Sequence, residues 1–180
     1  PALPMTPEQR RHFLDNIIAD AERLDRLLVR LRELARAELQ AESGETTVSD
    51  IVAYLAGRFP ELDIVSRGEL NVAFALPFEA ASIVLSNLAE NAVQHGATRL
   101  ELTPGADDHL RTLLVRDNGS GISEGNRALI FQPFFSTRRE QGGTGMGLDI
   151  VRTALNAHGG TIRLMDEPGP GAAFQIAVPL

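Results

Sequence analysis

Two glycine-rich clusters, DNGSGI at 117–122 and GGTGMGL at 142–148, flank the aromatic segment IFQPFFSTRRE at 130–140. Upstream of them, residues 86–96 have the sequence SNLAENAVQHG. Glycine and asparagine also serve ordinary turns, so none of these four segments is specific by itself. Their occurrence together, in this order, is hard to explain by turns alone. The combination therefore indicates one binding site assembled from several segments.

The composition limits the kind of protein that carries these segments. The chain has 180 residues, 43% of them apolar, which is enough for one core with an appendage. Its formal net charge of −7 argues against a nucleic-acid partner, and any anionic ligand must be held by local arginines or backbone N–H groups. Cysteine is absent, which excludes a disulfide framework and a thiolate zinc site. No apolar run reaches the ~20 residues of a membrane-spanning helix, so we expect a cytoplasmic domain, with an upstream membrane segment left open.

Residues 7–42 are predicted to form one long helix. Apolar residues recur along it at spacings of three, four or seven, which gathers them in a stripe on one face. Such a helix needs a partner to bury that stripe, because it is not stable alone in water. A turn signal at 42–45 ends the helix, and we place a domain boundary there, between 1–44 and 45–180.

After this boundary, helical and strand-like patterns follow one another in separate groups. Helices and strands that segregate in this way predict an α+β fold, a two-layer α/β sandwich. The expected helices cover 49–58 (capped by Ser49), 77–95 and 145–158, and the expected strands cover 70–76, 98–104, 110–117, 161–167 and 172–180.

Taken together, the four segments resemble the ATP-binding domain of sensor histidine kinases. That domain belongs to the ATPase superfamily shared with DNA gyrase, the heat-shock chaperone ATPases and the MutL mismatch-repair protein. The resemblance implies a Bergerat-type ATP-binding fold, with ATP and Mg²⁺ as cofactors. Within 7–42, the sequence ERLDRLLVRLRELARAE resembles the second helix of the kinase dimerisation hairpin. A generic coiled-coil arm is the alternative for this helix.

Asn87 and Asn91 are four residues apart, so both side chains face the same side of their helix. An amide oxygen suits Mg²⁺, which prefers hard oxygen ligands and keeps waters and phosphates as the others. The resemblance implies that Asn91 is the metal ligand, that Asn87 contacts the nucleotide and that His95 lies near it. Hydrolases of the superfamily have a glutamate at the position of Asn87, and an amide cannot act as a general base. Glu90 lies about 100° round the helix from Asn91 and does not replace that glutamate, so transfer to another acceptor is favoured over hydrolysis.

The glycine clusters supply the remaining contacts that the resemblance implies. Asp117 would accept a hydrogen bond from the adenine amino group, although Asp-Asn-Gly is also an ordinary turn sequence. Glycines before the helix at 145–158 would expose backbone N–H groups to phosphate at a helix N-terminus. The second cluster is neither a dinucleotide fingerprint nor a Walker loop. The expected nucleotide-binding residues of the two clusters are Asp117, Gly119, Gly121, Ile122, Gly143, Thr144, Gly145, Met146, Gly147 and Leu148.

The aromatic segment between the clusters resembles the lid that covers ATP in kinases of the nitrogen-regulation type. Phe131 and Thr137 are expected to contact the nucleotide, with core packing as the alternative for Phe131. The guanidinium of Arg138 would pair with β- or γ-phosphate oxygens. The resemblance therefore implies Asn87 and Arg138 as the catalytic residues.

The chain departs from the family pattern in two places. Gln94 stands where a basic residue is common, so one phosphate contact is missing or is supplied by Arg138. A phosphoacceptor histidine that is followed by an acidic residue, and usually by Arg-x-Pro, is also absent, because His12, His95, His109 and His158 lack that context.

The preferred hypothesis is therefore a histidine kinase domain whose acceptor histidine lies outside this chain. It implies three partners: its own dimerisation domain, a homodimer partner and the receiver domain of a response regulator. A protein-serine kinase of the anti-sigma-factor type is one alternative, and a nucleotide-sensing interaction module without transfer activity is another. Hydrolysis of the gyrase or MutL kind is disfavoured by Asn87.

Overall fold

The computed structural model describes residues 11, 14, 46–106, 109–138 and 143–180. The predicted helix 7–42 lies outside the described residues except at Arg11 and Leu14, which are helical and exposed. The proposed boundary at residue 44 also lies outside them.

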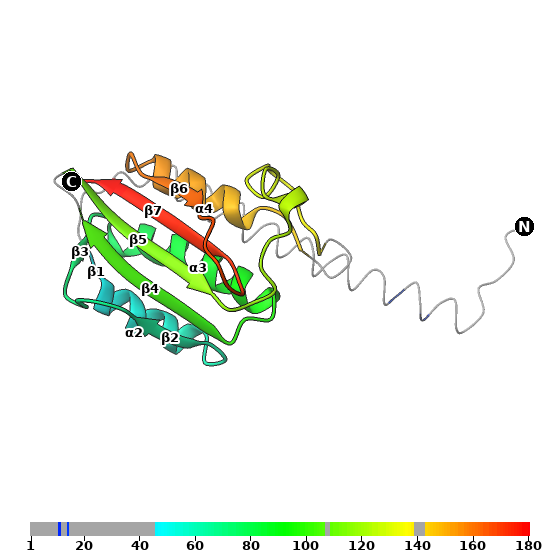
Figure 1. Ribbon diagram of the computed structural model, residues 1–180, viewed down its shortest axis with the longest axis horizontal. Helices are drawn as coiled ribbons and strands as arrows, with labels where there is room; N and C mark the ends of the chain where they lie inside the picture. Colours follow the sequence, from blue (N-terminus) through cyan, green and yellow to red (C-terminus); the bar gives the residue numbers. More distant parts are fainter. Residues whose placement is uncertain (1–10, 12–13, 15–45, 107–108, 139–142) are drawn as a thin grey trace, which may run out of the picture.

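The described residues form two layers, a five-stranded sheet with helices over one face (Figure 1). The strand order is β2-β4-β5-β7-β6, in which β2 pairs parallel to β4 and every other neighbouring pair is antiparallel. This arrangement confirms the predicted α+β two-layer sandwich. The strands of this sheet are β2 (Asp63–Ser66), β4 (Arg99–Ala106), β5 (Leu110–Asp117), β6 (Thr161–Leu164) and β7 (Ala173–Pro179). The helices are α2 (Val48–Arg58), α3 (Phe78–Gln94) and α4 (Gly147–Asn156), with a 3-10 helix η1 (Glu124–Asn126).

The core lies between the helices and the sheet. Successive residues of a strand point to opposite faces, so Leu113 and Val115 of β5 are buried toward the helices. By the same alternation Asp117, at the end of β5, lies on the helix side, whereas Arg116 lies on the opposite face. The helices contribute to this core Val48, Ile51 and Leu55 from α2, Val84, Leu85 and Leu88 from α3, and Val151 and Leu155 from α4.

One strand prediction needs correction, and one strand was missed. The strand predicted at 70–76 is reduced to β3 (Ala73–Phe74), which pairs antiparallel with β1 (Thr46–Thr47) in a separate two-stranded sheet. β2 was not predicted at all. It is a short strand at the sheet edge with no fully buried side chain, so its residues carry no clear alternation of apolar and polar positions.

The helix predicted at 49–58 begins one residue earlier and is capped by Thr47 rather than Ser49. The Thr47 hydroxyl accepts the Asp50 backbone N–H at 3.2 Å, and the Asp50 carboxylate accepts the Thr47 N–H at 3.1 Å. The hydrogen bond from the Thr47 hydroxyl, and then that from its backbone N–H, lower the pKa of Asp50 below 3.8. Because this pKa is lowered on folding, its stabilising effect is present above pH 3.8 and is lost as the pH falls through the lowered value.

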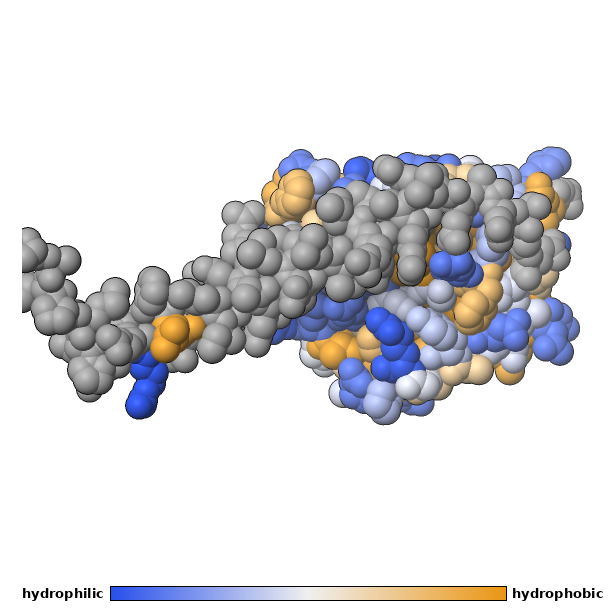
Figure 2. All heavy atoms as spheres, turned by 180° about the vertical axis from the view of Figure 1, so that it is seen from behind, coloured by the Kyte–Doolittle hydropathy of each residue, from blue (hydrophilic) through white to orange (hydrophobic). Residues whose placement is uncertain are grey.

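Seen from the side opposite to Figure 1, the described surface is a mixture of hydrophilic residues and smaller hydrophobic areas (Figure 2). No helix within the described ranges is long and apolar enough to cross a membrane. The large apolar side chains that the described residues leave exposed are Leu14, Leu70, Phe78, Phe134 and Leu180.

Candidate functional site

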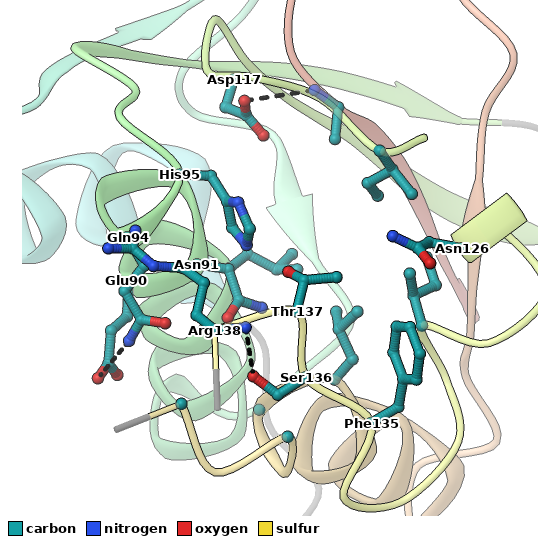
Figure 3. A pocket seen from close by; sticks show the side chains of 18 of the residues that line it. Glu90, Asn91, Gln94, His95, Asp117, Asn126, Phe135, Ser136, Thr137 and Arg138 are labelled. Carbon is teal, nitrogen blue, oxygen red and sulfur yellow. Dashed lines mark hydrogen bonds between the residues drawn. The ribbon is translucent and has the colours of Figure 1, made fainter. Parts of the chain in front are cut away.

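A cavity of about 420 Å³ lies between α3, the end of β5 and the loops that lead into α4 (Figure 3). Its volume is within the range of roughly 300–1,000 Å³ that small-molecule sites occupy. Most residues that the sequence nominated line this cavity, although they come from distant parts of the chain. These are Asn91, His95, Asp117, Gly121, Ile122, Thr137, Arg138, Gly143, Thr144, Gly145, Gly147 and Leu148.

The asparagines of α3 face the same loop, as their spacing predicts, but only Asn91 lines the cavity. A Cβ atom built on Gly147 would lie 3.4 Å from Oδ1 of Asn91 and 3.5 Å from Oδ1 of Asn87. Asn87 is only 2% exposed, and its Nδ2 donates to the carbonyl of Ile83 at 2.9 Å. Asn87 is therefore buried beside the cavity without lining it, and its contact with the nucleotide stays a prediction.

Asn91 differs from Asn87 in what its amide contacts. Within the described part of the chain, no hydrogen bond engages the Asn91 side chain, which Figure 3 shows among the cavity-lining residues of α3. The described residues contain no group of three or more His, Cys, Asp or Glu that could hold a metal ion. An amide oxygen beside the uncapped N-terminus of α4 still fits Mg²⁺, because this ion takes few protein ligands when phosphates and waters supply the others.

Asp117 lies at one end of the cavity, at the end of β5. Its Oδ1 accepts the backbone N–H of Gly119 at 2.8 Å and that of Ala172 at 3.3 Å. No hydrogen bond to its other carboxylate oxygen is recorded among the described residues. One oxygen is thus held by the backbone, and the other remains able to accept a hydrogen bond from a ligand.

Gly119 does not line the cavity, and its contact with the nucleotide stays a prediction. A Cβ built on it would lie 2.8 Å from the carbonyl oxygen of His95 and 3.0 Å from Oδ1 of Asp117. The glycine is needed because two segments approach its backbone too closely for a side chain. Its N–H serves the cavity indirectly, through Asp117.

The second glycine cluster forms the N-terminus of α4. No side chain caps this helix at Met146, so its first-turn N–H groups stay available beside the cavity. Met146 itself is buried and does not line the cavity, so its contact with the nucleotide stays a prediction. Gly145 has a φ of 69°, and a Cβ there would overlap the backbone of Phe134. Only glycine allows this loop to lie directly against the 134–138 segment.

The aromatic segment contributes its second half to the cavity. Phe135, Thr137 and Arg138 line it, and the Ser136 hydroxyl accepts the Arg138 N–H at 3.1 Å (Figure 3). Phe131 does not line it, and its contact with the nucleotide stays a prediction. Its ring instead meets that of Phe174 edge-on, with centroids 6.4 Å apart, which is the core packing held open as the alternative.

Several cavity residues were not nominated from the sequence. Arg58 reaches the cavity from the last turn of α2, and Gln94 and Glu90 from α3, where Gln94 Nε2 contacts the Glu90 carboxylate at 3.5 Å. Nothing in the local sequence relates Arg58 to α3, since only the packing of α2 on α3 brings them together. The other unnominated residues are Leu88, Ser123, Asn126, Ile130, Phe135, Ser136, Ala172 and Phe174.

Comparison with known proteins adds an independent finding. The model of the family described as histidine kinase-, DNA gyrase B-, and HSP90-like ATPase matches residues 79–180. Among curated proteins, the sensor-type histidine kinase PrrB of Mycobacterium tuberculosis is 30% identical over 98% of this chain and 42% of its own length. The sensor histidine kinase CpxA of Escherichia coli is 38% identical over 56% of this chain and 23% of its own length. The chain therefore spans less than half the length of these curated relatives.

Solved structures show the same similarity. Full-length ShkA in complex with AMPPNP superposes with a TM-score of 0.70 at 24% identity, over 98% of this chain and 40% of that one. The ATP-binding domain of PrrB from Mycobacterium tuberculosis superposes with a TM-score of 0.62 at 26% identity, over 77% of this chain and 97% of that one. The likeness to ShkA concerns the fold alone.

Proposed function

Because the chain belongs to the histidine kinase-, DNA gyrase B-, and HSP90-like ATPase family, we propose that 45–180 form the catalytic ATP-binding domain of a two-component sensor histidine kinase. The observation that carries the proposal is the cavity. An amide oxygen from α3, a carboxylate at the end of β5 and the open N-terminus of α4 meet around one space of nucleotide size. Residues 1–44 would then be part of the dimerisation hairpin.

ATP would bind with its base at Asp117 and its phosphates at the loop before α4. The Asp117 oxygen that lacks a backbone partner accepts the amino group of adenine, while Gly121 and Ile122 line the same end of the cavity. The N–H groups around 143–148 receive the phosphates, where the helix dipole favours negative charge. Mg²⁺, when bound through Asn91, would neutralise phosphate charge.

The reaction is transfer of the γ-phosphoryl group to a histidine outside this chain. Catalysis of this kind depends mainly on positioning and charge neutralisation, which Arg138 can provide from the cavity wall. Asn87 supports the reaction indirectly: its buried amide stands where the hydrolases have their base, and an amide cannot activate water. The receiver domain of a response regulator would then take the phosphoryl group from the histidine.

Phosphoryl transfer is tested by incubating the chain with ATP labelled at the γ-phosphate and Mg²⁺. We expect no label on the chain alone, because none of His12, His95, His109 and His158 is followed by the acidic residue expected after an acceptor histidine. An added helical-hairpin domain that carries an acceptor histidine should acquire an acid-labile label. Label on the chain alone would contradict the proposed acceptor. ATP binding without any transfer would favour the alternative, a nucleotide-sensing module.

Recognition of the base is tested by Asp117→Asn. This change should weaken ATP binding by about 1.5–3 kcal/mol, the range for a hydrogen bond that involves a charged group. GTP should compete poorly for the wild-type protein, because its C6 oxygen would face the carboxylate. Isothermal titration calorimetry measures both affinities, with Asp63→Asn as the control, since Asp63 pairs with Arg99 on the surface. Equal affinity of the wild-type protein for ATP and GTP would remove Asp117 from this role.

A further inference from the structure

The loop between β6 and β7 (165–172) folds back onto the end of β5. The backbone N–H of Asp117 donates to the carbonyl of Ala172 at 2.9 Å, and the Ala172 N–H donates to Oδ1 of Asp117 at 3.3 Å. The Asp117 carboxylate is therefore positioned by this loop as well as by Gly119 on its own strand end. A shift of the loop would change the direction in which the carboxylate points.

Two glycines make this approach possible. Gly171 has a φ of 87°, and a Cβ built on it would overlap the carbonyl oxygen of Asp117. Gly121, with a φ of 71°, would place its Cβ 2.9 Å from the carbonyl oxygen of Gly171. Three backbone segments thus touch without intervening side chains, so a displacement of the loop is transmitted directly to the cavity end that contains Asp117.

Arg116 holds this loop from the other face of the sheet. Its Nη2 donates to the carbonyl of Pro168 at 2.6 Å, and its Nη1 contacts the Glu167 carboxylate at 3.3 Å. Both side chains are only about one third exposed, at 32% for Arg116 and 29% for Glu167, so solvent screens this pair less than a surface pair. Arg116 therefore reaches two consecutive residues of the loop without lining the proposed nucleotide cavity.

The other contacts of the loop are weaker. Arg127 donates to the carbonyl of Met165 at 3.3 Å and pairs with Asp166 at 3.1 Å, but the Asp166 side chain is 95% exposed. A second cavity of about 230 Å³ lies against the loop and is lined by Arg116, Glu167 and Gly169 among others. The loop is thus not closely packed on this side, and its position depends on polar anchors.

We infer that Arg116 is a positioning residue for recognition of the base. By holding the 165–172 loop, it keeps the Ala172 N–H on one oxygen of Asp117 and leaves the other oxygen directed at the amino group of adenine. The inference rests on the proposed role of Asp117, and nothing in it requires Arg116 to touch the nucleotide. It assigns a specificity-determining function to a residue on the face of the sheet opposite the helices.

The first test needs no nucleotide. In an amide-resolved NMR spectrum, Arg116→Ala should shift the Ala172 amide proton upfield and accelerate its exchange with solvent, because its hydrogen bond to Asp117 is lost. Arg116→Lys should restore the signal in part, since an ammonium can reach one of the two acceptors but lacks the planar fork for both. Arg67→Ala is the matched control, because Arg67 forms an exposed pair with Glu101 away from the loop. An unchanged Ala172 signal in Arg116→Ala would overturn the inference.

The second test measures selectivity for the base. ATP is compared with purine riboside triphosphate, which lacks the exocyclic amino group. The wild-type protein should bind ATP more tightly than the analogue. Arg116→Ala should reduce this preference about tenfold, because it lowers the affinity for ATP and leaves the affinity for the analogue unchanged. In Glu167→Gln, Arg116 keeps its hydrogen bond to the carbonyl of Pro168, so the preference for ATP should fall less. This variant also serves as the test if Arg116→Ala does not fold.

The outcomes separate the two hypotheses. A wild-type protein that binds both nucleotides equally would contradict the role of Asp117 and, with it, that of Arg116. A wild-type preference that persists in both variants would contradict only the role of Arg116. An equal loss of affinity for both nucleotides in Arg116→Ala would also contradict the role of Arg116, because a purely structural role does not distinguish between the two nucleotides.

Discussion

Replacing Asn91 with alanine should abolish the Mg²⁺-dependent part of nucleotide affinity while the fold is retained. Asn91 lines the cavity, and no hydrogen bond of its side chain to another described residue is recorded. Its loss should therefore cost the fold little. Mutation of the outer-shell partners of a metal commonly costs about 10–100-fold in metal affinity, so loss of the ligand itself should reach at least the upper end. Titration of an ATP analogue with and without Mg²⁺ measures the effect.

The matched control for this experiment is Gln94→Ala. Gln94 also lines the cavity from α3, one turn beyond Glu90, but the proposal gives it no part in metal binding. Its replacement should leave the ratio of affinities with and without Mg²⁺ unchanged. If Asn91→Ala preserves that ratio as well, Asn91 is not the metal ligand.

A second large effect is expected from Gly145→Ala. A Cβ at this position would overlap the backbone of Phe134, and the φ of 69° is itself unfavourable for alanine. A residue held in such a conformation costs about 1–3 kcal/mol. Either the loop before α4 or the 134–138 segment must move, and both line the cavity. We expect at least about a tenfold loss of nucleotide affinity, measured by calorimetry.

The sheet and the helix core do not depend on this contact, so Gly145→Ala should still fold, with its thermal unfolding midpoint lowered by about 2–4 °C for each kcal/mol of that strain. Gly125→Ala is the control, because Gly125 has no positive φ and a Cβ there would meet no atom within 4 Å. Undiminished nucleotide binding by Gly145→Ala would show that the close approach of the two segments is not needed for the site.

The parts of the fold in which apolar residues recur at a regular spacing were predictable from the sequence. β5 was predicted with its observed bounds, and α3 and α4 were predicted within about two residues of theirs. Their buried positions recur at the spacing of a helix or alternate as in a strand, so local pattern and tertiary packing agree. The short strands β1, β2 and β3 carry no such period, because each is only partly buried. β2 and the β1–β3 pair were missed or misplaced for that reason.

The candidate site was predictable where a residue type is tied to a chemical role, as at Asn91, Asp117 and the glycines before α4. It was not predictable where tertiary packing determines whether a side chain lines the cavity. Phe131 and Met146 belong to segments that line the cavity, but Phe131 packs against Phe174 and Met146 is buried, and neither lines the cavity. Arg58 and Arg116 carry no local signal, since their partners are brought to them by other elements.

The parallel pairing of β2 with β4 has a consequence for the order in which the sheet assembles. β4 and β5 are joined by a short connection and can pair soon after collapse, whereas β2 can reach β4 only after the intervening α3 has formed and crossed over. Closing that long loop is slow relative to forming a hairpin. The edge strand is therefore added late to a sheet that already contains the end of β5. Contacts of β2 would then govern the rate of unfolding more than the rate of folding.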